Sequence, residues 1–136
     1  MSLTIDQAQA CLDDKFAPWI KALDLRVTDL NKSGATLEMP ITDQLTRFGD
    51  VLSGQALAAL ADTSMVFACF GLFESFAPVA TTNLEMQFLR PGVGERIRCE
   101  AHIVKPGNNL IFTRADMIAE PSGKCVATAT ATFYLA

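Results

Sequence analysis

The chain has 136 residues, of which 50% are apolar and 19% are charged, a composition typical of one globular domain rather than of a disordered segment. Its formal net charge of −4 argues against broad binding to nucleic acids or to anionic membrane surfaces. We therefore expect a single domain over residues 1–136, with no nucleic acid and no membrane among its partners.

The charge is unevenly distributed along the chain. Residues 1–89 contain 5 Lys/Arg and 11 Asp/Glu, a net charge of −6, whereas residues 90–136 contain 6 and 4, a net charge of +2. This is either ordinary surface variation or the sign that the C-terminal third holds a small polyanion locally.

The cysteines and the N-terminus bear on localisation. The four cysteines are far apart and form no CxxC pair, and "MSLTIDQAQACLDDKF" has neither a basic segment nor an apolar one. These features predict a reduced, cytoplasmic protein without a signal peptide.

The first elements are short. Residues 4–24 begin with Thr4, a good N-cap, and have Asp6 in the first turn, but Pro18 interrupts them, which predicts one short helix and then a turn or a second helical piece. Residues 25–41 predict a β-hairpin around "NKSG", because apolar residues alternate along "GATLEMPI". "TDQLTRFGD" is polar and typical of a loop.

Residues 51–73, "VLSGQALAALADTSMVFACFGLF", predict a long apolar helix with Ser53 as its N-cap. The run is long enough to span a bilayer. Gln55 and Asp62 interrupt it, however, and no Lys/Arg cluster flanks it, so we expect a helix buried in a protein core. Burying the Asp62 carboxylate without a partner would cost several kcal/mol or more, so this residue needs a partner or a function.

The remaining residues predict four antiparallel strands with short turns. The first has an apolar face with Leu84, Met86 and Phe88 and a polar face with Thr81, Asn83, Glu85 and Gln87. The last, "CVATATATFYL", alternates alanine with threonine, and small inward residues leave room for a helix. The expected fold class is therefore α+β, with one long central helix wrapped by a curved antiparallel sheet of five to six strands.

Several chemistries lack their residues in this sequence. The single histidine, His102, lies on the polar face of a strand without a nucleophile nearby. The spacings typical of zinc ligands, and the GxGxxG, P-loop and GxSxG motifs, do not occur. We expect no metal and no cofactor, which leaves cofactor-free catalysis or simple binding.

One constellation is compatible with catalysis, "SGQALAALAD". The N-terminus of a helix offers free N–H groups to an oxyanion, and a carboxylate in an apolar pocket can act as a general base or a nucleophile. Structural roles are also possible, close packing for Gly54 and a backbone contact for Asp62. Eight helical residues rise about 12 Å, so a shared reaction centre requires two antiparallel helices in a two-fold dimer.

The stretch "RFGDVLSGQALAALADTSMVFA", with "VATTNLEMQFLRP" downstream, resembles the PaaI-like branch of the hot-dog fold acyl-CoA thioesterases. Members typically show Asn-x-x-Gly-x-x-His-Gly-Gly-x(6)-Asp here, followed by a strand that ends in a similar proline. The resemblance covers roughly residues 35–136. It implies a hot-dog fold, hydrolysis of an acyl- or aryl-CoA to the free acid and CoA, a homodimer with a continuous sheet, and often a dimer of dimers.

The resemblance also implies roles for individual residues. Asp62 resembles the acidic catalytic residue, and Gly54 resembles the glycine whose N–H polarises the thioester carbonyl, with the backbone of Gln55 beside it. Thr81 falls where some relatives have a hydroxyl that orients water.

The chain departs from the family pattern at three positions. Ser53 stands where histidine is usual, and Gln55 replaces the second glycine. Arg47 falls where an asparagine often orients the carbonyl or the water, although a one-residue shift of the loop would place Thr46 there instead. Without the histidine, a hot-dog dehydratase is disfavoured.

Two binding roles complete the hypothesis. Phe67 and Phe70, after Asp62, are candidates for the acyl pocket, and Arg90, Arg98 and Lys105 are candidates for binding the CoA phosphates. The alternatives are a non-catalytic acyl-CoA- or lipid-binding hot-dog protein, favoured by the three departures, and another α+β ligand-binding fold with a helix on a curved sheet.

Overall fold

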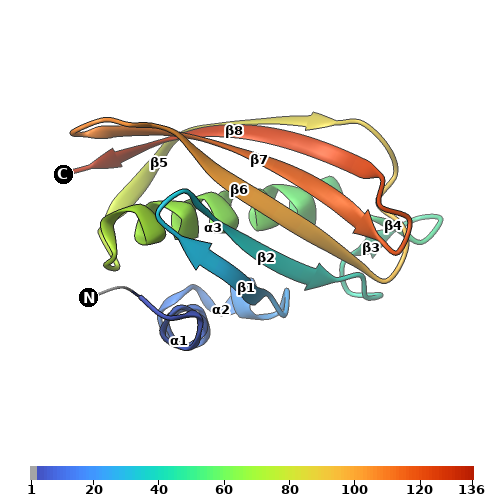
Figure 1. The fold of residues 1–136 in the computed structure, drawn as a ribbon. Coiled ribbons are helices and arrows are strands. Elements are labelled where there is room, and N and C mark those ends of the chain that lie inside the picture. Colours follow the sequence, from blue (N-terminus) through green and yellow to red (C-terminus); the bar gives the residue numbers. More distant parts are fainter. Residues whose placement is uncertain (1–2) are drawn as a thin grey trace.

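A computed structural model describes residues 3–136. The helix α3 (Gly54–Phe73) lies in the curve of a six-stranded antiparallel sheet (Figure 1). In spatial order the strands are β1 (Arg26–Asn31), β2 (Gly34–Pro40), β6 (Arg96–Pro106), β7 (Leu110–Glu120), β8 (Cys125–Leu135) and β5 (Val79–Phe88). The predicted α+β class, with one central helix and an antiparallel sheet, is confirmed.

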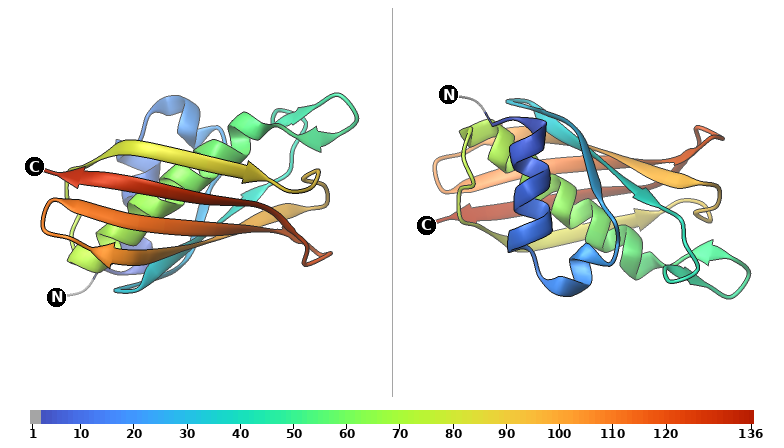
Figure 2. Two further views of the ribbon diagram at one scale, coloured as in Figure 1. Left: turned by 90° about the horizontal axis from the view of Figure 1, so that it is seen from above. Right: turned by 90° about the horizontal axis from the view of Figure 1, so that it is seen from below.

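Two short helices precede the sheet, so the predicted first helix is confirmed and, of the two alternatives after Pro18, the second helical piece is the one that forms. In α1 (Ile5–Lys15), Thr4 caps the first turn and exchanges hydrogen bonds with Gln7 in a capping box. Pro18 then opens α2 (Pro18–Lys21), where its missing N–H costs nothing. Seen from below, α1 crosses α3 on the side that the sheet leaves open (Figure 2).

The strand β8 lets the helix lie close to the sheet. Its inward residues Ala127, Ala129 and Ala131 are at most 5% exposed, and they pair with Phe88, Met86 and Leu84 of β5. Methyl groups at these positions leave the space between the layers to the side chains of α3. The predicted inward alanine face is therefore confirmed.

The segment before α3 is not the simple loop that its polar residues predict. It forms a hairpin of two short strands, β3 (Thr46–Arg47) and β4 (Val51–Leu52), whose turn has positive φ at Gly49 (81°) and Asp50 (58°). Two-residue strands are too short to show alternation in the sequence. Both views in Figure 2 show this hairpin and the start of α3 extending past the edge strand β5.

Candidate active site

The first turn of α3 has two backbone N–H groups without a partner. Ser53 is the N-cap, as predicted, and its Oγ accepts the N–H of Ala56 at 3.2 Å. The N–H of Leu57 donates to the Ser53 carbonyl at 3.2 Å. Among residues 3–136, neither Gly54 nor Gln55 has an acceptor for its N–H. These two groups, at the positive end of the helix, are free to bind an oxyanion.

Packing does not require a glycine at position 54. A Cβ added there would meet only the ring of Phe88, at 3.4 Å, an ordinary van der Waals distance. The backbone of Gly54 is partly exposed, and Gln55 beside it is exposed. The close-packing explanation for Gly54 is therefore not supported.

A cavity of about 410 Å³ opens at this turn. Its lining joins the β3–β4 hairpin, the start of α3 and the segment after β5, and consists of Arg47, Val51, Leu52, Gly54, Leu57, Phe88, Leu89, Arg90, Pro91 and Gly92. The structure thus brings the predicted residues Arg47, Gly54 and Arg90 together. Phe88 forms a wall of this cavity, a role that the alternation of β5 does not reveal although it predicts an inward side chain there.

Asp62 lies further along α3, half-buried, and its partner comes from β5. The hydroxyl of Thr81 donates to Oδ1 of Asp62 at 2.9 Å. Burial raises the pKa of Asp62 above its ordinary value, and the hydrogen bond from Thr81 opposes this increase. The carboxylate therefore has a side-chain partner rather than the backbone partner of the structural alternative.

A β-bulge directs Thr81 towards Asp62. In the pairing of β5 with β8, Thr81 opposes Phe133 and Asn83 opposes Thr132, so Thr82 is an extra residue. Phe133 is fully buried on the inner face, and Thr81, its partner, shares that face. The prediction that Thr81 lies on the outer polar face with Asn83 is wrong, because simple alternation does not anticipate a bulge.

The predicted acyl-pocket residues Phe67 and Phe70 lie in the core. Phe67 has no exposed surface and Phe70 is 7% exposed. Phe67 stacks on Phe16 at 5.4 Å between ring centroids and contacts Phe70 edge-on at 5.0 Å. Phe70 also contacts Phe76, and neither Phe67 nor Phe70 lines the cavity within one subunit.

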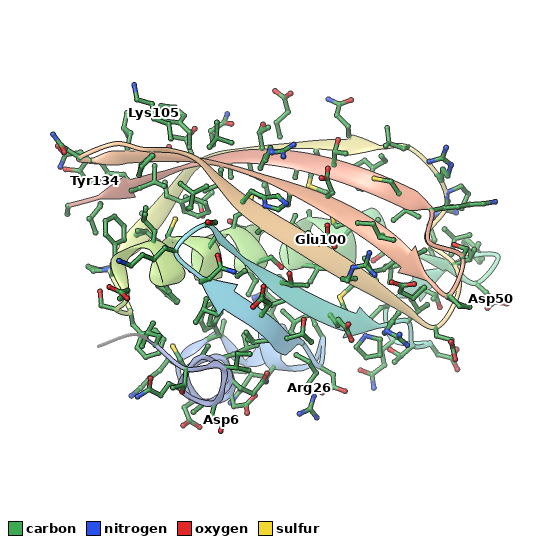
Figure 3. The ribbon with its side chains drawn as sticks, viewed as in Figure 1. Asp6, Arg26, Asp50, Glu100, Lys105 and Tyr134 are labelled. Carbon is green, nitrogen blue, oxygen red and sulfur yellow. The ribbon has the colours of Figure 1, made fainter. Side chains whose placement is uncertain are left out.

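Two predicted phosphate-binding residues lie away from the cavity. Arg98, on the outer face of the sheet, binds Glu100 at 2.9 Å and also Glu120, so carboxylates already neutralise it. Lys105 lies near the far end of the sheet from Asp50 and the β3–β4 hairpin (Figure 3). Neither lines the cavity, and only Arg90 of the three candidates does.

The buried cysteines do not provide a nucleophile, and the described residues do not form a metal site. Burial raises the pKa of the Cys69 and Cys99 thiols to about 12, so neither forms a thiolate at neutral pH. Within residues 3–136 no three His, Cys, Asp or Glu side chains are grouped so as to hold a metal ion. The long apolar helix α3, which has the length and composition of a membrane span, is the core helix of the fold.

The family model described as "Thioesterase superfamily" matches residues 49–126, more than half of the chain. The chain belongs to this superfamily, and its class of activity is thioester hydrolysis. The matched segment includes Gly54, Asp62 and Thr81.

Relatives and solved structures agree with this assignment. Human acyl-coenzyme A thioesterase 13 is 30% identical over 101 residues, which cover 72% of this chain and 70% of that protein. A crystal structure of a thioesterase family protein from Silicibacter pomeroyi has 32% identity and a TM-score of 0.80, covering 87% of this chain and 88% of that one. The PaaI protein of E. coli, at 20% identity, has a TM-score of 0.84 over 96% of this chain and 91% of its own. The predicted hot-dog fold and PaaI-like resemblance are confirmed.

Proposed function

We propose that the protein hydrolyses an acyl- or aryl-CoA thioester to the free acid and CoA, in a site shared by two subunits of a homodimer. One observation carries the proposal: two complementary halves of a reaction centre lie at opposite ends of the edge strand β5. The Asp62 carboxylate and its hydrogen-bond donor Thr81 lie at its start, and the free N–H groups of Gly54 and Gln55 lie beside Phe88 at its end.

The two halves cannot meet within one subunit. Asp62 and Gly54 are eight residues apart on one continuous helix, a rise of about 12 Å. A thioester carbon must lie within about 3–3.5 Å of the group that attacks it. Each subunit therefore contributes one half to each of two sites.

Pairing of two β5 edges brings complementary halves together. The outer edge of β5 has no strand beside it among residues 3–136. Because Thr82 is an extra residue, the position midway between Thr81 and Phe88 along the ladder is Glu85, which pairs with Thr130. A two-fold axis at Glu85 would set Thr81 of one subunit opposite Phe88 of the second in an antiparallel pair. The start of α3, which extends past this edge in Figure 2, would then lie over the second subunit.

The reaction follows from this arrangement. The thioester carbonyl oxygen accepts the N–H groups of Gly54 and Gln55, which stabilise the oxyanion as it forms. As a general base, the Asp62 carboxylate of the other subunit removes a proton from a water molecule while that water attacks the carbonyl carbon. As a nucleophile, the carboxylate attacks the carbon itself, and water then hydrolyses the resulting anhydride to release the acid. Thr81, by donating to Oδ1, keeps the carboxylate oriented and leaves Oδ2 free. The sulfur leaves as the CoA thiol with one proton.

The departures from the family pattern have consequences for these roles. The hydroxyl of Ser53 is used to cap α3, so we give it no contact with substrate. Arg47 lines the cavity and therefore can contact substrate where relatives have an asparagine. The relatives named as acyl-CoA thioesterases support CoA as the thiol. We expect the dimer to be cytoplasmic, consistent with four free cysteines, and to pair into a dimer of dimers.

The test follows thiol release from acetyl-, hexanoyl-, long-chain and aryl-CoA substrates. We expect at least one of these substrates to be turned over, and Asp62→Asn to abolish most of the rate. Full activity of Asp62→Asn, or tight acyl-CoA binding without turnover of any thioester, would contradict the proposal.

Mixing of inactive variants tests the shared site. Asp62→Asn and Gly54→Val chains, unfolded together and refolded, should regain about a quarter of wild-type activity, since half of the dimers then contain one intact site of two. The matched control mixes Asp62→Asn with a chain carrying both substitutions, and it should stay inactive. No recovery in the first mixture would place each whole site within one subunit.

A further inference from the structure

Two arginines of the cavity have no anionic partner in the structure. Arg47 and Arg90 line it, and no acidic residue of the same subunit does. Three other arginines each have a carboxylate within 4.0 Å, namely Arg26, Arg96 and Arg98. Among residues 3–136, Arg47 donates only to the Phe48 carbonyl at 3.4 Å, and Arg90 only to the Cys125 carbonyl at 2.7 Å.

Two guanidinium groups at one cavity favour an anion from outside the chain. Guanidinium N–H groups bind carboxylates and phosphates in a planar, two-pronged geometry. Two unpaired arginines at one cavity contrast with the chain as a whole, which has a net charge of −4. The cavity would therefore bind a small anion, and an acyl-CoA offers two kinds, its phosphates and a carboxylate on the acyl group.

The position of the cavity distinguishes these two sources. Gly54, whose N–H is proposed to bind the thioester oxygen, is part of the cavity wall. The pantetheine arm between sulfur and the first phosphate has the length of about four extended residues, roughly 15 Å. An extended arm would place the phosphates beyond this cavity, whereas the acyl group begins at the bound carbonyl.

The remaining wall suits a short carbon chain or a ring. It is formed by Val51, Leu52, Leu57, Phe88 and Leu89. The volume of the cavity, about 410 Å³, lies in the usual range for small-molecule sites. We propose that the preferred acyl group of this thioesterase ends in a carboxylate, which Arg47 and Arg90 bind. This inference rests on the proposed function and assigns these two residues to substrate specificity.

The test compares glutaryl and pentanoyl thioesters, which differ only in a carboxylate in place of a methyl group. Both are made as CoA esters and as N-acetylcysteamine esters, which contain no phosphate. We expect the wild type to prefer glutaryl by about tenfold or more in kcat/KM on both carriers. Arg47→Gln should reduce that preference about tenfold, and Arg47→Lys, which keeps the charge but not the two-pronged geometry, should keep only part of it.

Arg26→Gln is the matched control. Arg26 is exposed and paired with Asp24, and Figure 3 shows it on the side of the molecule below α2. The preference should be unchanged in this variant. Arg90 is left in place because its bond to the Cys125 carbonyl also joins the end of β5 to β8.

Four outcomes would overturn the inference. Turnover of pentanoyl esters without a preference for glutaryl would refute the acyl carboxylate and leave the thioesterase function intact. Equal losses for both CoA esters in Arg47→Gln, with none for the N-acetylcysteamine esters, would assign Arg47 to the phosphates. Equal losses in kcat for all four substrates would assign it to the carbonyl. Absence of turnover for every thioester tried would overturn the proposed function as well.

Discussion

Gly54 and Gly71 lie near opposite ends of α3, and their surroundings differ sharply. A Cβ at Gly71 would lie 2.2 Å from the backbone oxygen of Asn31, a distance that real side chains do not reach. A Cβ at Gly54 would meet only the Phe88 ring, at 3.4 Å. The first glycine is free of packing constraints, whereas the second allows the helix to lie against the β1–β2 turn.

The two halves of the helix follow the same division. The second half contains the buried rings of Phe67 and Phe70 and packs against Phe16 and Phe76. The first half begins at a cavity, where the N–H groups of Gly54 and Gln55 have no partner. One continuous apolar run thus provides stability at one end and an open site at the other, and substitutions at the two ends should separate these properties.

The largest effect is expected for Asp62→Asn. Loss of a general base or nucleophile should lower kcat about 10³-fold, measured as thiol release at pH 7. Oδ1 of asparagine can still accept from Thr81, so the fold should be retained.

The same variant should be more stable than the wild type at pH 7. Burial raises the pKa of Asp62 in the fold, so the native state binds more protons than the unfolded state, and stability falls as pH rises from the unfolded pKa through the folded one. Asparagine does not ionise, so Asp62→Asn avoids this loss of stability and gains stability relative to the wild type at pH 7. Thermal melts at pH 7 should show the gain, and it should vanish below about pH 4, near the pKa of an unperturbed aspartate. A gain equal at both pH values would contradict this cause.

The next largest effect should be on stability, for Gly71→Ala. The added methyl group must displace the backbone at Asn31, at a cost of about 3 kcal/mol. Urea unfolding measures the loss, while kcat per folded molecule should stay near the wild-type value. Unchanged stability would remove the contrast between the two glycines.

Gly54→Ala should behave in the opposite way. Its methyl group would lie in the cavity against Phe88, where the thioester must approach, and kcat should fall about tenfold to a hundredfold. The free energy of unfolding should change by less than about 1 kcal/mol, because alanine favours helix. Loss of stability similar to that of Gly71→Ala would show that Gly54 is a packing residue.

The smallest effect is expected for Thr81→Val. Without the donated hydrogen bond the pKa of Asp62 should rise further, so the acidic limb of the pH–rate profile should move to higher pH. Thr81→Ser keeps the donor and should restore the wild-type limb. An unchanged limb in Thr81→Val would show that the hydroxyl does not act on Asp62.

Local patterns predicted the elements of this fold well. Alternation identified β1, β2 and β5–β8, and capping residues located the starts of α1 and α3, because these signals arise from neighbours in sequence. The β3–β4 hairpin escaped prediction, since two-residue strands have no periodicity.

The site was harder to predict because it depends on contacts between distant segments. Thr81 was assigned to the wrong face because a single bulge residue at Thr82 changes the alternation. Arg98 was a candidate until the pairing of β6 with β7 placed Glu120 beside it. Phe67 and Phe70 could not be separated from pocket residues, since a helix that is apolar on all sides does not indicate which side faces the core.

The alanines of β8 have a consequence for the chemistry although none of them bears a functional group. They act as spacers, since methyl groups at Ala127, Ala129 and Ala131 determine how near the helix layer can approach the strand layer. The contact between Asp62 and Thr81 spans those two layers. A larger residue at one of these positions, for instance in Ala131→Val, should therefore lengthen the hydrogen bond between Thr81 and Asp62. Residues that never touch a substrate thus influence the rate.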